Sequence, residues 1–112
     1  MIAAETTTHR LKVHPGPFRA IKRGDKRFEY RKDDRGFRID HRLFLMEWDP
    51  AEGDYTGDEL MVLVTHMTRG PDFDVPRGYV IMSIAPITMP VHVKGDLAEE
   101  RRRRDGLGTE AL

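Results

Sequence analysis

The sequence predicts an α+β domain in which five strands form a small mixed β-barrel with one main helix packed against it. Five short segments have strand character and one has helix character, and most connections between them are short and rich in glycine and proline. Two of the strand segments are apolar on both faces. In a chain of 112 residues, such strands indicate a sheet that curls on itself and leaves few open edges.

The first strand and the helix are expected near the start of the chain. Residues 10–14 alternate polar and apolar side chains, as a half-buried strand does, and residues 15–17 (Pro-Gly-Pro) end that strand. A proline is tolerated in the first turn of a helix, so the helix is expected to begin there, with Phe18 and Ile21 on its apolar face. Gly24 is placed to end it.

Four more strands are expected after the helix. In the second strand, residues 26–31, Phe28 and Tyr30 lie on one face and Glu29 and Arg31 on the other. Residues 49–57 are rich in turn formers and predict a long hairpin connection. The remaining strands are expected at residues 42–48, 58–68 and 79–84. The aromatic side chains assigned to the core are those of Phe28, Phe44 and Trp48.

The chain is expected to form one domain, because its length allows a modest core and not two. Residues 1–8 are a polar leader, residues 9–90 form the domain, and residues 91–112 are a charged tail that forms a short helix or is disordered. No apolar run is long enough to span a bilayer, and the N-terminus lacks the features of a signal peptide. With no cysteine present, the cytoplasm is the expected location.

Charge is divided unevenly along the neutral chain. Residues 9–42 hold 12 lysines and arginines against 5 aspartates and glutamates, whereas residues 43–93 hold 2 against 8. Such a division suggests one positive face and therefore an anionic partner. The interpretation assumes that the two halves remain apart on the folded surface.

The most specific local pattern is Gly24-x-Lys26-x-x-Glu29-x-Arg31. Strand alternation places Glu29 and Arg31 on one face, and Lys26 can converge on them. Two cations around a carboxylate at a cleft can grip a phosphate, bind a base edge or position a water. The alternative is a solvated salt-bridge cluster with no ligand.

A wider set of basic residues extends this pattern into a predicted nucleic-acid surface, with two aromatic residues as candidates for stacking on bases. For those two, Tyr30 and Phe37, a place in the barrel core is the alternative. The predicted nucleic-acid-binding residues are Lys12, His14, Arg19, Lys22, Arg23, Lys26, Arg31, Lys32 and Arg35.

The pattern of the other reactive side chains does not favour a metal or cofactor. The five histidines show no HxH or HxxxH spacing, and no carboxylates complete a ligand set or a triad around them. The serine and threonines of the strands have no evident base beside them. No metal site and no cofactor are therefore predicted.

At these residues the sequence resembles the small ASCH domains of the PUA-like superfamily, in the phage and bacterial branch known as DUF3850. The resemblance implies a five- or six-stranded barrel with a helix over a cleft that Lys26, Glu29 and Arg31 line. It also implies association with RNA or modified bases. The matching motifs include Pro15-x-x-Phe18-x-Ala20-Ile21-x-x-Gly24-x-Lys26-x-Phe28-Glu29-x-Arg31, Leu43-x-Leu45-x-Glu47-Trp48-Asp49-Pro50, Arg69-Gly70-Pro71 and Gly78-Tyr79-Val80-x-Met82-Ser83.

Two departures from the family pattern bear on shape and chemistry. Similar proteins have Gly-Asp where this chain has Asp40-His41, so the turn before the third strand is expected to differ. Relatives that deacylate N4-acetylcytidine share Lys26 but carry a nucleophilic threonine at the position of Glu29. A carboxylate can act as a base toward water, but it cannot follow the threonine mechanism unchanged.

Three functions follow as hypotheses. The first is a module that binds nucleic acid, in particular RNA or single-stranded nucleic acid, or a modified nucleotide, in a basic cleft. The alternative is a hydrolase acting on RNA or a modified nucleoside, with Glu29 and Lys26 as its catalytic residues. The third is a phage accessory protein that binds a host protein. The residues by themselves do not require catalysis, predict no membrane partner, and leave the oligomeric state open.

Overall fold

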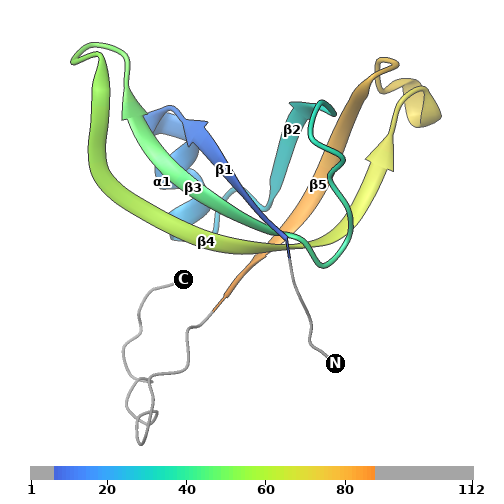
Figure 1. Ribbon diagram of the computed structural model, residues 1–112, viewed down its shortest axis with the longest axis horizontal. Coiled ribbons are helices and arrows are strands. Elements are labelled where there is room, and N and C mark those ends of the chain that lie inside the picture. Colours follow the sequence, from blue (N-terminus) through green and yellow to red (C-terminus); the bar gives the residue numbers. More distant parts are fainter. Residues whose placement is uncertain (1–6, 88–112) are drawn as a thin grey trace, which may run out of the picture.

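The computed structural model describes residues 7–87, which form one curved sheet and a helix (Figure 1). Residues 1–6 of the predicted leader lie outside the described residues, and so does the whole predicted tail, residues 91–112. Within them, the nine-residue helix is too short to cross a bilayer, and no other helix is long and apolar enough to do so. In chain order the elements are β1 (Thr8–Val13), α1 (Pro15–Arg23), β2 (Phe28–Lys32), β3 (Arg42–Asp49), β4 (Asp54–Arg69), the short 3₁₀ helix η1 (Asp72–Asp74) and β5 (Tyr79–Pro86).

The sheet is mixed, five-stranded and open. Its strand order is β1-β3-β4-β5-β2, with β1 parallel to β3 and every other neighbouring pair antiparallel. Figure 1 shows it bent into a U, with β1 at the edge of one arm and β2 at the edge of the other. The mixed sheet, its curl and its single main helix confirm the predicted α+β architecture. The barrel is only half closed, because β1 and β2 do not pair with each other.

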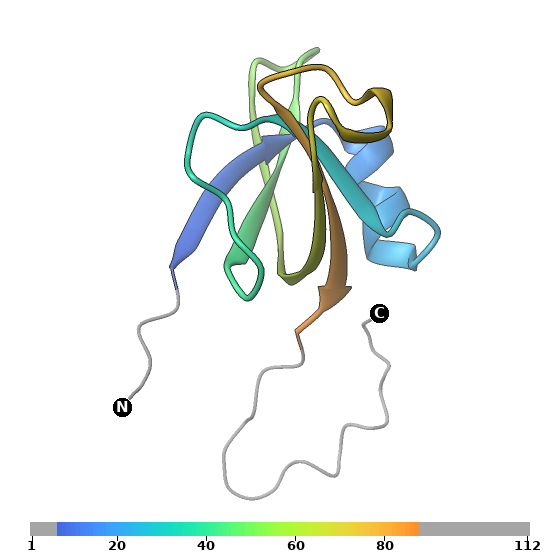
Figure 2. The same cartoon turned by 90° about the vertical axis from the view of Figure 1, so that its right-hand side faces the viewer.

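The helix lies between the arms of the U (Figure 1), and in the view turned by 90° it stands to one side of the strands (Figure 2). It begins at Pro15, so the Pro-Gly-Pro segment that was expected to end the first strand forms the first turn of the helix. Prolines fit there because the N–H groups of a first turn have no partner within the helix. It ends at Gly24, whose φ of 89° lies in the left-handed region that glycine adopts without strain. Phe18 and Ile21 are its buried residues, as predicted.

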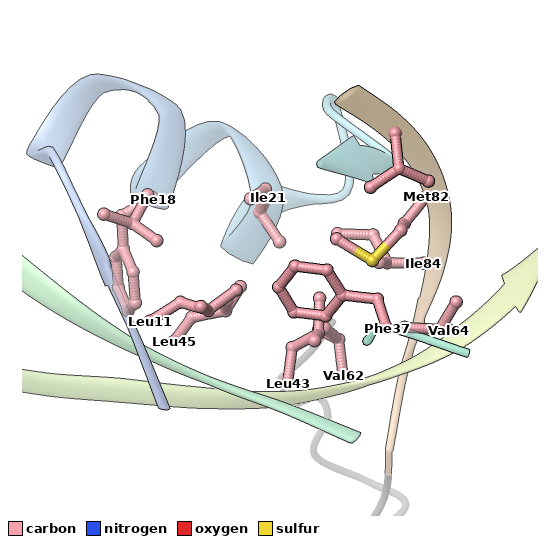
Figure 3. Close-up of a cluster of buried hydrophobic side chains, with 12 residues drawn as sticks. Leu11, Phe18, Ile21, Phe37, Leu43, Leu45, Val62, Val64, Met82 and Ile84 are labelled. Carbon is pink, nitrogen blue, oxygen red and sulfur yellow. The ribbon is translucent and has the colours of Figure 1, made fainter. Parts of the chain in front are cut away.

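The core lies between this helix and the concave face of the sheet (Figure 3). Alternation along β1 and β3 directs Leu11, Leu43 and Leu45 inward, and each is at most 1% exposed. Phe37 also belongs to this cluster, with 1% of its surface exposed, although it lies in the connection between β2 and β3. The ring borders the cleft, but with 1% of its surface exposed it offers no open face for a base to stack on. The hypothesis that Phe37 stacks on bases is therefore corrected: the residue fills the core.

The face of β2 that is buried is the one with Glu29, not the aromatic face, whose Phe28 was assigned to the core. Phe28 and Tyr30 do share one face, but they are 45% and 46% exposed, whereas Glu29 on the opposite face is 5% exposed. Phe28 was predicted in the core, and that prediction is wrong. Because β2 is an edge strand at the mouth of the U, its inner face borders the opening and its outer face meets solvent. Trp48, also assigned to the core, is half-buried.

The hairpin between β3 and β4 is shorter than predicted. The fourth strand begins at Asp54, not at residue 58, and Trp48 pairs with Tyr55. Gly57 has a φ of 94°, and the pairing register shifts opposite it between Met46 and Trp48. Such a bulge interrupts a strand without ending it. The glycine that suggested a turn therefore marks an irregularity inside a strand.

The turn before β3 contains a left-handed residue without glycine. Asp40 has a φ of 75°, its N–H donates to the carbonyl of Val64 at 2.8 Å, and Val64 in turn donates to the carbonyl of His41 at 2.9 Å. Aspartate tolerates this conformation better than most residues because its short polar side chain bonds locally. Asp40 thus adopts the left-handed conformation that glycine favours, although the turn was expected to differ in shape because it lacks the glycine of similar proteins.

Candidate functional site

The opening between β1 and β2 forms a cleft of about 670 Å³. The two arms of the U bring these edge strands to face each other (Figure 1). Tyr30, Tyr79 and Glu29 also line the cleft. The predicted ligand-binding residues that line it are Lys12, His14, Lys26, Arg31, Lys32 and Arg35. The structure thus brings together residues from three separate segments of the basic half.

The carboxylate of Glu29 is held between two cations. Its Oε2 accepts a hydrogen bond from Nε of Arg31 at 2.7 Å, and its Oε1 lies 3.7 Å from Nζ of Lys26. The glutamate side chain is 6% exposed, against 23% for Lys26 and 27% for Arg31. The predicted convergence of these three residues is therefore present. It provides a fixed acceptor beside two donors at a partly accessible place.

Two arginines bridge the cleft and satisfy the free edge of β1. Nη2 of Arg31 donates to the carbonyl of Lys12, and Nη1 of Arg35 donates to the carbonyl of Arg10, both at 2.7 Å. In the parallel pairing with β3, the alternate residues of β1 turn their peptide groups toward this edge. Arg31 and Arg35 therefore protect an unpaired strand edge as well as supplying charge to the cleft.

Lys12 contributes its backbone to the cleft, and its charge lies elsewhere. The residue alternates with the buried Leu11 and Val13, so its side chain lies on the outer face of the sheet. There its ammonium sits 3.9 Å from the centre of the Trp48 ring, in a cation–π contact. The Lys12 ammonium therefore lies on the outer face, and its part in nucleic-acid binding stays a prediction.

The three cations of the helix are neutralised by carboxylates. Nε of Arg19 donates to the buried carboxylate of Glu47 at 3.1 Å. The same carboxylate accepts a hydrogen bond from the hydroxyl of Thr56 at 2.6 Å. The two other ion pairs, each at 2.9 Å, are Lys22 with Asp58 and Arg23 with Asp25. None of Arg19, Lys22 and Arg23 lines the cleft. The acidic hairpin packs beside the basic helix, so the division of charge along the sequence does not become one continuous positive face.

Comparison with known proteins agrees with this architecture. Residues 8–84 match the model of a family described as a domain of unknown function, DUF3850, a stretch that runs from the start of β1 into β5 and includes the cleft. The chain belongs to the DUF3850 family. It is also similar to an "Uncharacterized 12.9 kDa protein in GpA 3'region" of Escherichia phage P2, with 31% identity over 101 residues that cover 86% of this chain and 89% of the phage protein.

Tyr79 is one of the cleft residues of this DUF3850 protein that sequence reasoning missed. Tyr79 is the first residue of β5, and its ring centre lies 5.5 Å from that of Tyr30 at an interplanar angle of 30°. Tyr79 is 37% exposed. The two tyrosines are 49 positions apart, and only the antiparallel pairing of β2 with β5 brings them together. An aromatic residue at the start of a strand was the one signal in the sequence.

A histidine pair joins the starts of β1 and β3. Nε2 of His9 lies 2.9 Å from Nδ1 of His41, and the His9 ring packs edge-on against Phe37 with 4.7 Å between ring centres. Within residues 7–87, histidine, aspartate and glutamate side chains form no group of three or more that could hold a metal ion. The His9–His41 pair is therefore a contact between the start of β1 and the residue before β3.

We expect the DUF3850 domain to lose stability in mild acid through His9. Burial, followed by the charges of His41 and Arg35, lowers the pKa of His9 from its usual 6.5. The unfolded chain therefore binds a proton that the folded chain resists, and stability falls as the pH drops below about 6.5 toward the folded-state pKa. Urea unfolding of wild type and His9→Gln at pH 7.5 and 5.5 measures this: the loss between the two pH values should be smaller in the variant. An equal loss in both would contradict the role of His9.

Proposed function

We propose that this protein binds nucleic acid, in particular RNA, or a modified nucleotide, in the cleft between β1 and β2. The observation that carries the proposal is the buried carboxylate of Glu29, fixed between Lys26 and Arg31. The edge of a nucleobase presents donors and acceptors side by side, and a carboxylate next to a cation offers the complementary pair. A glutamate accepts hydrogen bonds from the amino group of cytosine, for example.

The rim of the cleft supplies charge for the phosphate. Lys32 and Arg35 both line it and are exposed, and neither forms a salt bridge within residues 7–87. The helix cations, which are already paired, contribute little. Two phosphate contacts on a single strand predict a log–log salt slope of roughly −1.4, or about a sevenfold loss of affinity from about 50 to about 200 mM salt. This dependence is weaker than the sequence alone suggested.

The similarity of the sequence to ASCH domains of the PUA-like superfamily supports the same class of ligand. That superfamily is associated with RNA binding and with the reading of modified bases. The half-barrel with one helix is compatible with this assignment. The related chemistry of a hydrolase would use Glu29 as a base toward water and Lys26 to stabilise a developing oxyanion.

The test is fluorescence polarisation of labelled single- and double-stranded RNA and DNA at two salt concentrations. We expect Lys26→Ala to weaken binding about tenfold, because it removes a cation that charges the cleft and faces Glu29. The matched control is Lys22→Ala, since that ammonium pairs with Asp58 outside the cleft and its loss should leave affinity unchanged. Lys26 is preferred to Arg31 as the probe because Arg31 also bridges two strands.

Each contrary outcome redirects the assignment in a defined way. Absence of binding to every probe at low salt would refute nucleic-acid binding, and free modified nucleosides would then be tested. Equal weakening by Lys22→Ala and Lys26→Ala would place the site outside the cleft. Cleaved probe recovered after the titration would establish the hydrolase. Nuclease-resistant capture of one host protein, with no probe bound, would favour the accessory-protein function.

A further inference from the structure

The outer face of the β2–β5 ribbon carries large aromatic side chains that folding leaves in solvent. Phe28 and Tyr30 are 45% and 46% exposed, and Tyr79 is 37% exposed. The antiparallel register pairs Lys32 with Tyr79, and Tyr30 with Ile81, so these side chains lie on one face of the ribbon. A cluster of exposed aromatics on a short edge strand is more than the scattered apolar residues that any surface shows.

Two of the three rings are in contact, and lysines lie beside the aromatic side chains. The Tyr30 and Tyr79 rings are in contact, tilted by 30° with 5.5 Å between their centres. Nζ of Lys26 sits 4.3 Å from the centre of the Phe28 ring. Lys32 lies opposite Tyr79 in the strand pairing. Aromatic faces with cations beside them are the combination that binds the bases and the backbone of a single strand.

This surface is joined to the cleft over the free edge of β2. Tyr30 and Glu29 lie on opposite faces of the strand, yet both line the same hollow, as Tyr79 and Phe28 also do. Backbone bonds from Ile84 to Arg27, and from Asp33 to Gly78, fix which residues pair with β5. By alternation, the peptide groups of Tyr30 point away from β5, toward the open edge. The hollow therefore runs from Glu29 around this edge to the two tyrosines.

We propose that Tyr30 and Tyr79 form a stacking platform for the base next to the one held at Glu29. The ligand is then a single-stranded polynucleotide of at least two nucleotides. A flexible strand can turn over the edge of β2 and expose successive base faces, whereas a duplex keeps its bases stacked and paired. The inference rests on the proposed function, and it selects among the ligands that the proposed function allows.

The experiment compares three probes of one sequence: a mononucleotide, a single-stranded tetranucleotide and a duplex. For wild type we expect the tetranucleotide to bind about tenfold more tightly than the mononucleotide, because stacking is worth on the order of a factor of ten per base. The duplex should bind no better than the mononucleotide. A tetranucleotide with abasic sites beside one retained base keeps the phosphates but loses the stacking, and it should bind within about threefold of the mononucleotide.

The variant is Tyr30→Leu combined with Tyr79→Leu, which keeps apolar bulk and removes the aromatic faces. It should bind the tetranucleotide and the mononucleotide within about threefold of each other, with mononucleotide affinity unchanged. The matched control is Phe73→Leu, an aromatic residue that is 91% exposed and does not line the cleft. Thermal unfolding of all variants verifies that they remain folded.

The outcomes separate this inference from the proposed function. If the mononucleotide binds and the tetranucleotide binds no more tightly, or the tyrosine variant keeps the wild-type gain, the platform is refuted while the cleft assignment stands. Tight binding of the duplex or of the abasic probe also refutes it. If no probe binds, both proposals fall, and capture of a protein partner through these tyrosines would assign the surface to protein binding.

Discussion

Phe37→Ala is expected to lower the free energy of unfolding by about 3–5 kcal/mol, the usual cost of removing a fully buried phenylalanine. The ring is 1% exposed and belongs to the cluster that includes Leu43, Val62 and Met82 (Figure 3). The cavity left behind is bordered by both arms of the U, so the surrounding side chains have little room to collapse into it. Urea unfolding of wild type and variant measures the difference.

The comparison with Phe73 separates burial from ligand binding. Phe73→Ala changes a ring that is 91% exposed, so its effect on stability should stay within about 0.5 kcal/mol. If Phe37→Ala unfolded at the wild-type urea concentration and selectively lost affinity for nucleic acid, Phe37 would be a base-stacking residue after all. A large loss of stability would instead confirm its place in the core.

Arg31→Met is expected to cost about 2–3 kcal/mol of stability, more than a typical surface arginine. The change removes the 2.7 Å bond to Glu29 and the 2.7 Å bond to the carbonyl of Lys12. It leaves a carboxylate that is 5% exposed with Lys26 at 3.7 Å as its remaining cation among the described residues. Losing one partner of a fully buried ion pair costs roughly 3–5 kcal/mol, and the partial exposure of Arg31 reduces that figure.

Two further variants test this explanation. Arg35→Met removes one bond to the carbonyl of Arg10 and no salt bridge within residues 7–87, so its cost should be about 1 kcal/mol or less. In the double variant Glu29→Met and Arg31→Met, no buried carboxylate is left without its arginine. The loss of stability should therefore be smaller than the sum of the two single losses. Additive losses would show that Glu29 and Arg31 are not energetically coupled.

Much of the fold follows from local sequence patterns. Prolines at the start of α1 and Gly24 at its end define the helix because their backbone preferences act wherever they occur. Alternation in the strands shows which side chains share a face, as Glu29 and Arg31 do. These are properties of neighbouring residues, and they survive whatever the rest of the chain does. The convergence of Lys26, Glu29 and Arg31 could therefore be predicted.

Alternation does not show which face of a strand is buried. The inward face of β2 is the charged one, because β2 lies at the open edge of the half-barrel while Phe18 and Phe37 fill the interior from elsewhere. The same limit applies to Tyr79, which joins Tyr30 through a pairing between strands far apart in sequence. Strand order and register decide these relations, and both are long-range.

The helix boundaries at its prolines and at Gly24, the alternation within the strands and the local triad follow from the sequence alone, since each depends on residues a few positions apart. Where the charges act depends on the tertiary fold. The fold places Glu47 against Arg19, Asp58 against Lys22 and the Lys12 ammonium over Trp48. Charge counted along a segment cannot anticipate this, because electrostatic interactions depend on distances in space, and folding brings the acidic half of the chain beside the basic half.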